Sequence, residues 1–169
     1  IPSWTVQTGL PQNLAQGAAV RSGNRIYYLG GGVWTNGVGP TLSKKVYMAT
    51  IGSGGTLGSW SEVTSLPIDL LGHQAVETGG RIVVTGGQGS NRVFNAVVNG
   101  DGTLGGWSET TNLPKILNRA ALVKINSTLI TMGGHDGSSY LNKVYTTEID
   151  GGGIPGSWTA SANNLPATN

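Results

Sequence analysis

The feature that most constrains the fold of this chain is a pattern that occurs three times with fixed internal spacing. In each copy a short, β-rich run ends on two adjacent glycines, at residues 25–31, 81–87 and 128–134. In each copy a Leu-Pro pair lies upstream, and its leucine is twenty residues before the first glycine. Downstream, each copy has a Val followed by an aromatic residue, and this Val is fourteen residues before a Trp. Two intervals that stay constant over three copies predict a repeat architecture. The repeated residues are the glycines Gly30, Gly31, Gly86, Gly87, Gly133 and Gly134 and the tryptophans Trp4, Trp60, Trp107 and Trp158.

The large variation in length is confined to one place in the repeat, between the double glycine and the Val-aromatic pair. The distance from the first glycine to the Val is sixteen residues in the first copy, seven in the second and eleven in the third. A constant frame with one variable segment collects its insertions on a single face of a repeat protein. This face is therefore the predicted binding surface.

Four strands fit into each repeat. We expect first strands at residues 15–20, 71–76 and 118–123, each followed by a tight turn of Gly, Ser and Asn that leads into the double-glycine strand. The third strand carries the Val-aromatic pair, and the fourth begins at the Trp. Four short antiparallel strands in about 50 residues form the blade of a β-propeller. The predicted fold class is all-β, with three four-stranded blades that make up half or part of a six- or seven-bladed propeller.

The same spacing predicts where the repeats begin and end. Trp4 precedes Leu10 by six residues, the interval that also separates Trp60 from Leu66. The expected divisions are the outer strand of a preceding blade at 1–9, repeats at 10–65, 66–112 and 113–164, and the start of a further repeat at 165–169.

The double-glycine strand, the aromatic residue of the third strand and the later Trp together resemble the kelch motif. The resemblance covers nearly the whole chain, from Trp4 to Pro166, and rests on three in-phase copies. The gap from Tyr47 to Trp60 is longer than in the common animal motif. Phrases such as Gly-Thr-Leu-Gly-Ser-Trp are similar to the bacterial kelch-like variety. The resemblance implies a kelch-type propeller.

Three blades do not close a propeller, which runs to about 4–8 blades. The two end blades would each expose an open sheet face, a hazard for association. Two solutions remain open from the sequence: further blades of a longer parent chain, or a head-to-tail homodimer that completes six blades.

Composition narrows the class of partner. The net charge is only +2, charged residues make up 11% of the chain, and Lys and Arg are scattered, which argues against nucleic acid. No apolar run approaches the roughly 20 residues of a membrane span. The low charge and the abundance of Gly, Thr, Ser and Asn favour an extracellular or cell-surface location, with a cytoplasmic one left open.

The residues that could carry out chemistry are few and dispersed. The chain has two histidines, His73 and His135, and eight acidic residues, without the spacing of a metal site or of a paired acid and base. The absence of cysteine excludes the Tyr-Cys radical copper chemistry of the galactose oxidase family, which shares the kelch-type propeller. We therefore expect no metal, no cofactor and no enzymatic activity, a glycan-active enzyme being the least favoured alternative. His73 is interpreted as a core or channel-facing residue.

The function that the sequence favours is recognition of a protein or glycan by the variable loops. Trp34 lies outside the repeat frame, so it is expected either to stack on a ligand or to cover its own loop. The alternative is a structural role in which the open blade edges pair with other copies. The candidate ligand-binding residues are Trp34, Asn36, Asn91, Arg92, His135, Asp136 and Tyr140.

Overall fold

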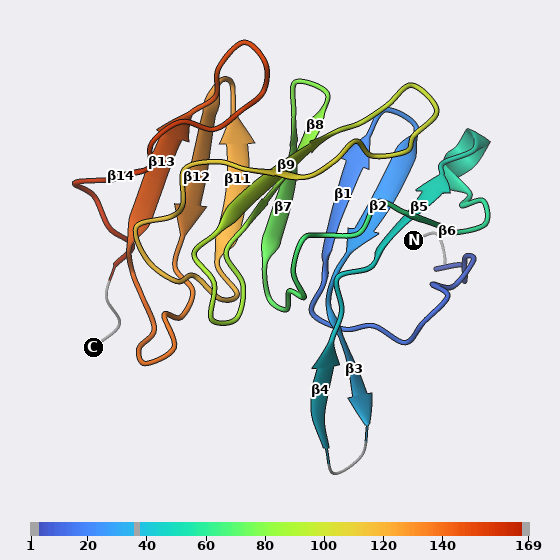
Figure 1. The fold of residues 1–169 in the computed structure, drawn as a ribbon, viewed down its shortest axis with the longest axis horizontal. Helices are drawn as coiled ribbons and strands as arrows, with labels where there is room; N and C mark the ends of the chain where they lie inside the picture. Colours follow the sequence, from blue (N-terminus) through green and yellow to red (C-terminus); the bar gives the residue numbers. More distant parts are fainter. Residues whose placement is uncertain (1–3, 36–37, 167–169) are drawn as a thin grey trace.

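The protein is built from three four-stranded antiparallel sheets, which we call blades 1 to 3 (Figure 1). The computed structural model describes residues 4–35 and 38–166. Blade 1 contains β1 (Ala18–Ser22), β2 (Arg25–Leu29), β5 (Val46–Thr50) and β6 (Ser61–Val63). Blade 2 contains β7 (Gln74–Thr78), β8 (Arg81–Thr85), β9 (Val93–Val97) and β10 (Ser108–Glu109). Blade 3 contains β11 (Ala121–Ile125), β12 (Thr128–Met132), β13 (Val144–Glu148) and β14 (Thr159–Ala160).

Two smaller elements interrupt this frame. A hairpin of β3 (Gly32–Thr35) and β4 (Val38–Leu42) extends from blade 1, and a single 3₁₀ turn (Ser53–Gly55) lies between β5 and β6. Among the described residues, no helix has the length and apolar character needed to cross a membrane.

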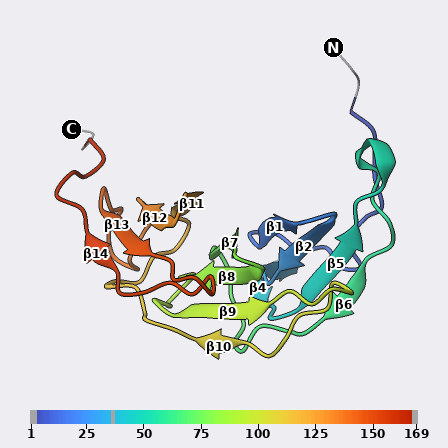
Figure 2. The same cartoon turned by 90° about the horizontal axis from the view of Figure 1, so that it is seen from above.

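The blades lie side by side in an arc with their first strands innermost (Figure 2). Strand β7 contacts both β1 and β11, so the inner strands form the concave side of the arc. This is the geometry of consecutive propeller blades, and the predicted all-β propeller fold is confirmed. Within the described chain, blade 1 and blade 3 each have one flank that no other blade covers.

The double glycines end the second strand of each blade because their φ angles are positive, a backbone conformation that residues with a Cβ atom disfavour. All six have positive φ, between 58° and 111°. The N–H of the first glycine donates to the carbonyl just before the third strand, as from Gly86 to Arg92 at 3.0 Å. The N–H of the second glycine donates to the next blade, from Gly31 to Leu70 and from Gly87 to Leu117. The pair thus joins its own sheet to the neighbouring one.

The carbonyl of the second glycine closes the base of each variable connection. It accepts a hydrogen bond from the residue three positions before the Val of the third strand. The three bonds are Ser43 N to Gly31 O at 2.9 Å, Ser90 N to Gly87 O at 3.1 Å, and Leu141 N to Gly134 O at 2.8 Å. Every variable connection therefore leaves and re-enters the blade at one fixed point.

The first strands begin three residues later than predicted, at Ala18, Gln74 and Ala121. The residue six positions after the repeat leucine has positive φ in each copy, which interrupts the extended backbone. These residues are Gln16 at 57°, Gly72 at 66° and Arg119 at 56°. Before this break, Ala15 and Asn118 each form only an isolated bridge. The prediction was wrong here because two of the three positions are not glycine.

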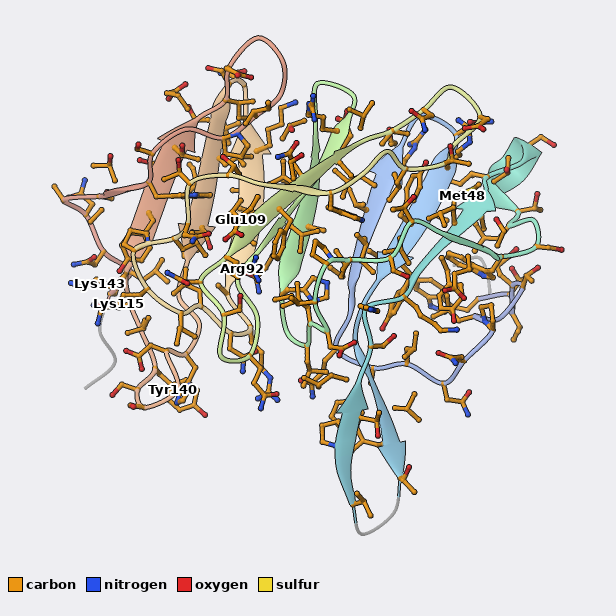
Figure 3. All side chains as sticks on the ribbon, viewed as in Figure 1. Met48, Arg92, Glu109, Lys115, Tyr140 and Lys143 are labelled. Carbon is orange, nitrogen blue, oxygen red and sulfur yellow. The ribbon has the colours of Figure 1, made fainter. Side chains whose placement is uncertain are left out.

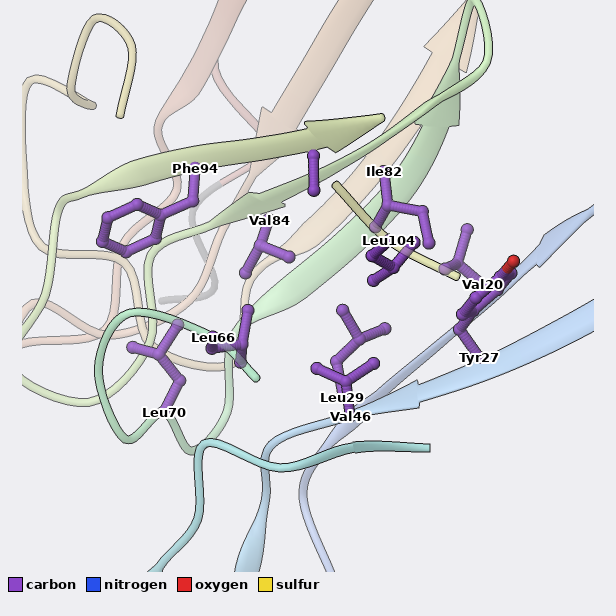
Figure 4. Packing of buried hydrophobic residues seen from close by; sticks show 11 residues of the cluster. Val20, Tyr27, Leu29, Val46, Leu66, Leu70, Ile82, Val84, Phe94 and Leu104 are labelled. Atoms are coloured by element: carbon purple, nitrogen blue, oxygen red, sulfur yellow. The ribbon is translucent and has the colours of Figure 1, made fainter. Parts of the chain in front are cut away.

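Two apolar clusters fill the spaces between blades. The larger, between blades 1 and 2, includes Tyr27, Leu29 and Phe94 (Figure 4). The second lies between blades 2 and 3 and includes Val83 and Trp158. Strand β8 belongs to both clusters, so residues Ile82–Thr85 are fully buried on both faces. A β-branched apolar run is what a strand covered on both sides requires.

Hydrogen bonds from side chains repeat across the two blade interfaces. Arg25 Nη2 donates to Gly100 O and Arg81 Nε to Gly152 O, both at 2.9 Å, and the two arginines begin the second strands of their blades. Buried hydroxyls of Tyr27 and Thr78 donate to the carbonyls of Gly102 and Gly153. Satisfied bonds of this kind fix the register of one blade on the next.

The outer strand of a preceding blade was predicted at residues 1–9, of which 1–3 lie outside the described residues. Residues 4–9 form no strand, and Trp4 is fully exposed. They nevertheless make contacts of the type that join successive blades. Thr8 Oγ1 donates to Leu57 O, and Trp60 Nε1 donates to Thr8 O at 2.9 Å. The same bonds recur one repeat later, from Thr64 to Leu104 and from Trp107 to Thr64. This segment therefore lies where the outer strand of an earlier blade would run.

Candidate binding site on the variable-loop face

The three variable connections and the Leu-Pro segments emerge on one face of the arc, the lower face in Figure 1. We call it the variable-loop face. In blade 1 the connection is the hairpin β3–β4, which projects beyond the other loops, whereas the connection of blade 2 is short (Figure 1). The sequence predicted a loop at residues 32–43, and the hairpin gives it a regular frame.

Trp34 lies on this hairpin and is 46% exposed. One edge of its ring lies beside Gly32, so the side chain both covers its own hairpin and presents surface to solvent. Val38 on the opposite strand is 67% exposed. Asn36, the other candidate of this loop, lies outside the described residues. The hairpin thus offers an apolar and aromatic surface to a ligand.

His135 and Tyr140 form the aromatic part of the blade 3 connection. Their rings pack edge to face at 4.9 Å between centroids, and their backbones form a bridge. His135 Nδ1 accepts a hydrogen bond from Gly137 N at 3.0 Å, which orients the imidazole. Tyr140 is 90% exposed and lies near the end of the loop (Figure 3).

Asp136, between these aromatic residues, is held by its own turn. Its Oδ1 accepts hydrogen bonds from the N–H groups of Ser138 and Ser139, and its Oδ2 lies 3.8 Å from Lys115 Nζ. The backbone bonds, with the Lys115 charge, lower the pKa of this carboxyl. Asp136 therefore shapes the loop as an ionised turn residue.

A cavity of about 310 Å³ opens beside the blade 3 connection, a size near the lower end for small-ligand sites. It is lined by Asn118, Arg119, Gly134, His135, Tyr140 and Leu141. The Arg119 guanidinium donates to Gln16 Oε1 of blade 1 at 2.9 Å, across the concave side of the arc. Sequence reasoning missed Asn118 and Arg119. The available signal was the repeat position of Arg119, which corresponds to Gln16 and Gly72 in the other two copies.

The other two candidates, Asn91 and Arg92, do not join this site. Asn91 Nδ2 donates to Leu113 O, and Asn142 makes the equivalent bond to Leu165 O. Arg92 Nε donates to Glu109 at 3.0 Å, and its guanidinium lies 4.7 Å from the Phe94 ring centroid. Figure 3 shows the Arg92–Glu109 pair on blade 2, away from Tyr140. Blade 1 repeats the ion pair as Lys45 and Glu62, which indicates a role in the blade frame.

His73 is buried between blades, 4% exposed, as the sequence interpretation expected. Neither ring nitrogen has a hydrogen-bond partner of normal geometry among the described residues. Burial lowers the pKa of His73 to about 4, and the nearby Leu29 carbonyl opposes part of this shift. The imidazole is therefore neutral in the folded protein.

Lowering the pH from about 7 to about 5 is expected to reduce the free energy of unfolding by about 2 kcal/mol through His73. The unfolded histidine binds a proton near pH 6.5 and the folded one only near 4, so the unfolded state gains protons first as the pH falls. Urea denaturation at both pH values measures the loss. His73→Leu should flatten the dependence in this window, and an unchanged slope would contradict the assignment.

Acidic residues elsewhere also serve local structure. Asp101 Oδ1 accepts hydrogen bonds from the N–H and hydroxyl of Thr103, and Asp150 Oδ1 accepts from Gly152 N at 2.9 Å. In the part of the chain that the structure describes, no group of three or more His, Cys, Asp or Glu residues could hold a metal ion.

Comparison with known proteins identifies the fold and no family. No protein-family model matches the sequence, and no curated protein matches it. Among solved structures, the chain is similar to the structure of YjhT, with a TM-score of 0.67 at 14% sequence identity. The match covers 90% of this chain and 47% of that one, so the chain spans about half the length of the similar structure. At this identity the likeness establishes the all-β propeller architecture alone.

Proposed function

We propose that this chain is a non-enzymatic, kelch-like propeller segment that binds a glycan through its variable-loop face, a protein surface being the alternative ligand. The observation that carries the proposal is the distribution of aromatic residues. The third-strand aromatic residues of the repeat frame, Tyr47, Phe94 and Tyr145, are buried, whereas Trp34 and Tyr140 are exposed on the loops of one face.

The chemistry of the blade 3 cavity favours a glycan. An exposed phenol ring provides a flat apolar surface, and the Asn118 amide and the Arg119 guanidinium provide polar groups beside it.

Tyr140→Ala and Trp34→Ala are each expected to weaken glycan binding at least about tenfold, because exposed aromatic anchors carry most of the energy of such contacts. A glycan array identifies the ligand, and titration calorimetry of the full chain with it measures the loss. Melting temperatures should stay nearly unchanged for both variants.

Val97→Ala is the matched control, since Val97 is an exposed apolar residue at the end of β9 in blade 2, on the face opposite the loops. It should bind as the unmodified chain does. If no glycan binds, the glycan assignment fails; if binding survives in both aromatic variants, the site lies elsewhere. A large fall in the stability of Trp34→Ala would assign that ring to packing.

A further inference from the structure

The two uncovered flanks of the arc are apolar at the positions that pack between blades elsewhere. Val83 and Val93 of blade 2 face blade 3 and are fully buried. Ile130 and Val144 hold the same repeat positions in blade 3 and are partly exposed, and Val123 beside them is 41% exposed.

The flank of blade 1 shows the complementary pattern. Ile82 and Val84 of blade 2 face blade 1 and are fully buried, whereas Ile26 and Tyr28 hold these positions in blade 1 and are partly exposed. A further blade that covered blade 3 would need an apolar flank, and the uncovered flank of blade 1 is apolar at the required positions. Packing the flank of blade 3 against the flank of blade 1 would add the same kind of apolar contact that joins the existing blades.

The backbone around the concave side carries a directional hydrogen-bond series that is complementary at its two ends. Gly72 N donates to Gln16 O at 2.8 Å, and Arg119 N donates to Gly72 O at 2.7 Å. Among the described residues, the N–H of Gln16 and the carbonyl of Arg119 have no backbone partner. In a closed ring the next bond in the series would run from the Gln16 N–H of one copy to the Arg119 carbonyl of the other.

We propose that the open flank of blade 3 receives the open flank of blade 1 from a second copy of this chain, so that two copies close a six-bladed ring. A head-to-tail contact that is used twice closes on itself with two-fold symmetry.

Closure requires one rearrangement. Residues 4–9 of one copy and 158–163 of the other would occupy the same outer position. Trp158 is buried in the core between blades 2 and 3, while Trp4 is fully exposed. Strand β14 therefore stays in place, and residues 4–9 leave Leu57 and Trp60. Thr128 stands where the other blades have Arg25 and Arg81, so the new junction lacks that link and is weaker than the existing ones.

The ring would also complete the binding face, an extension that rests on the proposed function. Within one chain, the Trp34 hairpin and the Tyr140 loop are separated by blade 2. At the junction between copies they belong to neighbouring blades, with residues 14–17 of the second copy bordering the blade 3 cavity. Each ring would then carry two composite sites.

Sedimentation velocity of the full chain over a wide concentration range tests the ring. We expect a species of twice the 17.3 kDa chain mass. Val123→Lys places a charge in the junction and should weaken dimerisation at least about tenfold. Val97→Lys puts the same charge on an exposed position of blade 2, between the two flanks, and should leave the mass unchanged. In the unmodified dimer, amide exchange at Gln16 should slow.

Three outcomes would overturn the proposal: a monomer at every concentration, open-ended growth of mass, or a dimer that Val123→Lys leaves intact. The glycan titration, repeated with the Val123→Lys monomer, separates the two proposals. Loss of the ring with binding retained would leave the loop face as the site, and a ring that binds no glycan would leave the assembly valid.

Discussion

A Gly86→Ala variant is expected to lose about 2–5 kcal/mol of unfolding free energy, the sum of left-handed backbone strain and overpacking. Gly86 has φ of 67°, and a Cβ there would overlap the carbonyl oxygen of Leu117 in blade 3. That carbonyl already accepts the hydrogen bond from Gly87 N. One methyl group would therefore push two blades apart and strain the bond between them.

Gly89→Ala separates the two causes. Gly89 has nearly the same φ, 70°, but no atom lies within 4 Å of its Cβ position. It should lose only the backbone contribution, about 1–2 kcal/mol. Urea denaturation of both variants measures the difference. Equal losses would show that the close approach of Leu117 contributes nothing to stability.

Phe94→Ala is expected to cost about 3–5 kcal/mol, a large share of the stability of a domain of this size. Phe94 is fully buried in the cluster between blades 1 and 2, where it packs with residues such as Leu66 and Leu70 (Figure 4). Truncation removes this contact and leaves a cavity that the β-strands on either side cannot fill by moving.

Phe94→Leu is the control because it keeps most of the apolar volume, and it should cost no more than about 1.5 kcal/mol. Chemical denaturation with matched m-values measures both losses. If Phe94→Ala unfolds at the same urea concentration as the unmodified chain, the interface between blades 1 and 2 does not limit stability.

The frame of the fold could be predicted from sequence because its parts are local and repeated. The double glycines mark positions where φ must be positive, and the two-residue turns need the same permissive backbone. Gly79 and Gly80 both have positive φ, as do Gly23 and Asn126 at the equivalent turns. Such requirements favour Gly or Asn at these positions, and these residue types therefore recur at a constant spacing in the sequence.

The rest depended on contacts between residues far apart in the chain. Gln16 and Arg119 adopt positive φ without being glycine, and their side chains meet across 103 residues. Arg92 was singled out because it lies in a variable region. Its partner Glu109 becomes evident only when the pair is compared with Lys45 and Glu62 one repeat earlier. Side-chain identity alone does not distinguish a ligand-binding loop residue from one that immediately precedes a strand and pairs within the blade, as Arg92 does.

The bond from the second glycine to the root of each variable connection has a consequence for how such a surface can change. It encloses eleven residues in blade 1, two in blade 2 and six in blade 3, with the same two anchoring atoms. The first enclosed residue, Gly32, Gln88 or His135, also bonds to Ala15, Leu71 or Asn118, and beyond it the peptide varies in length and sequence from blade to blade. The loops can therefore change in sequence and length while the strands of the blade stay the same. A foreign segment grafted between the two anchoring residues should leave the blade beneath it unaltered.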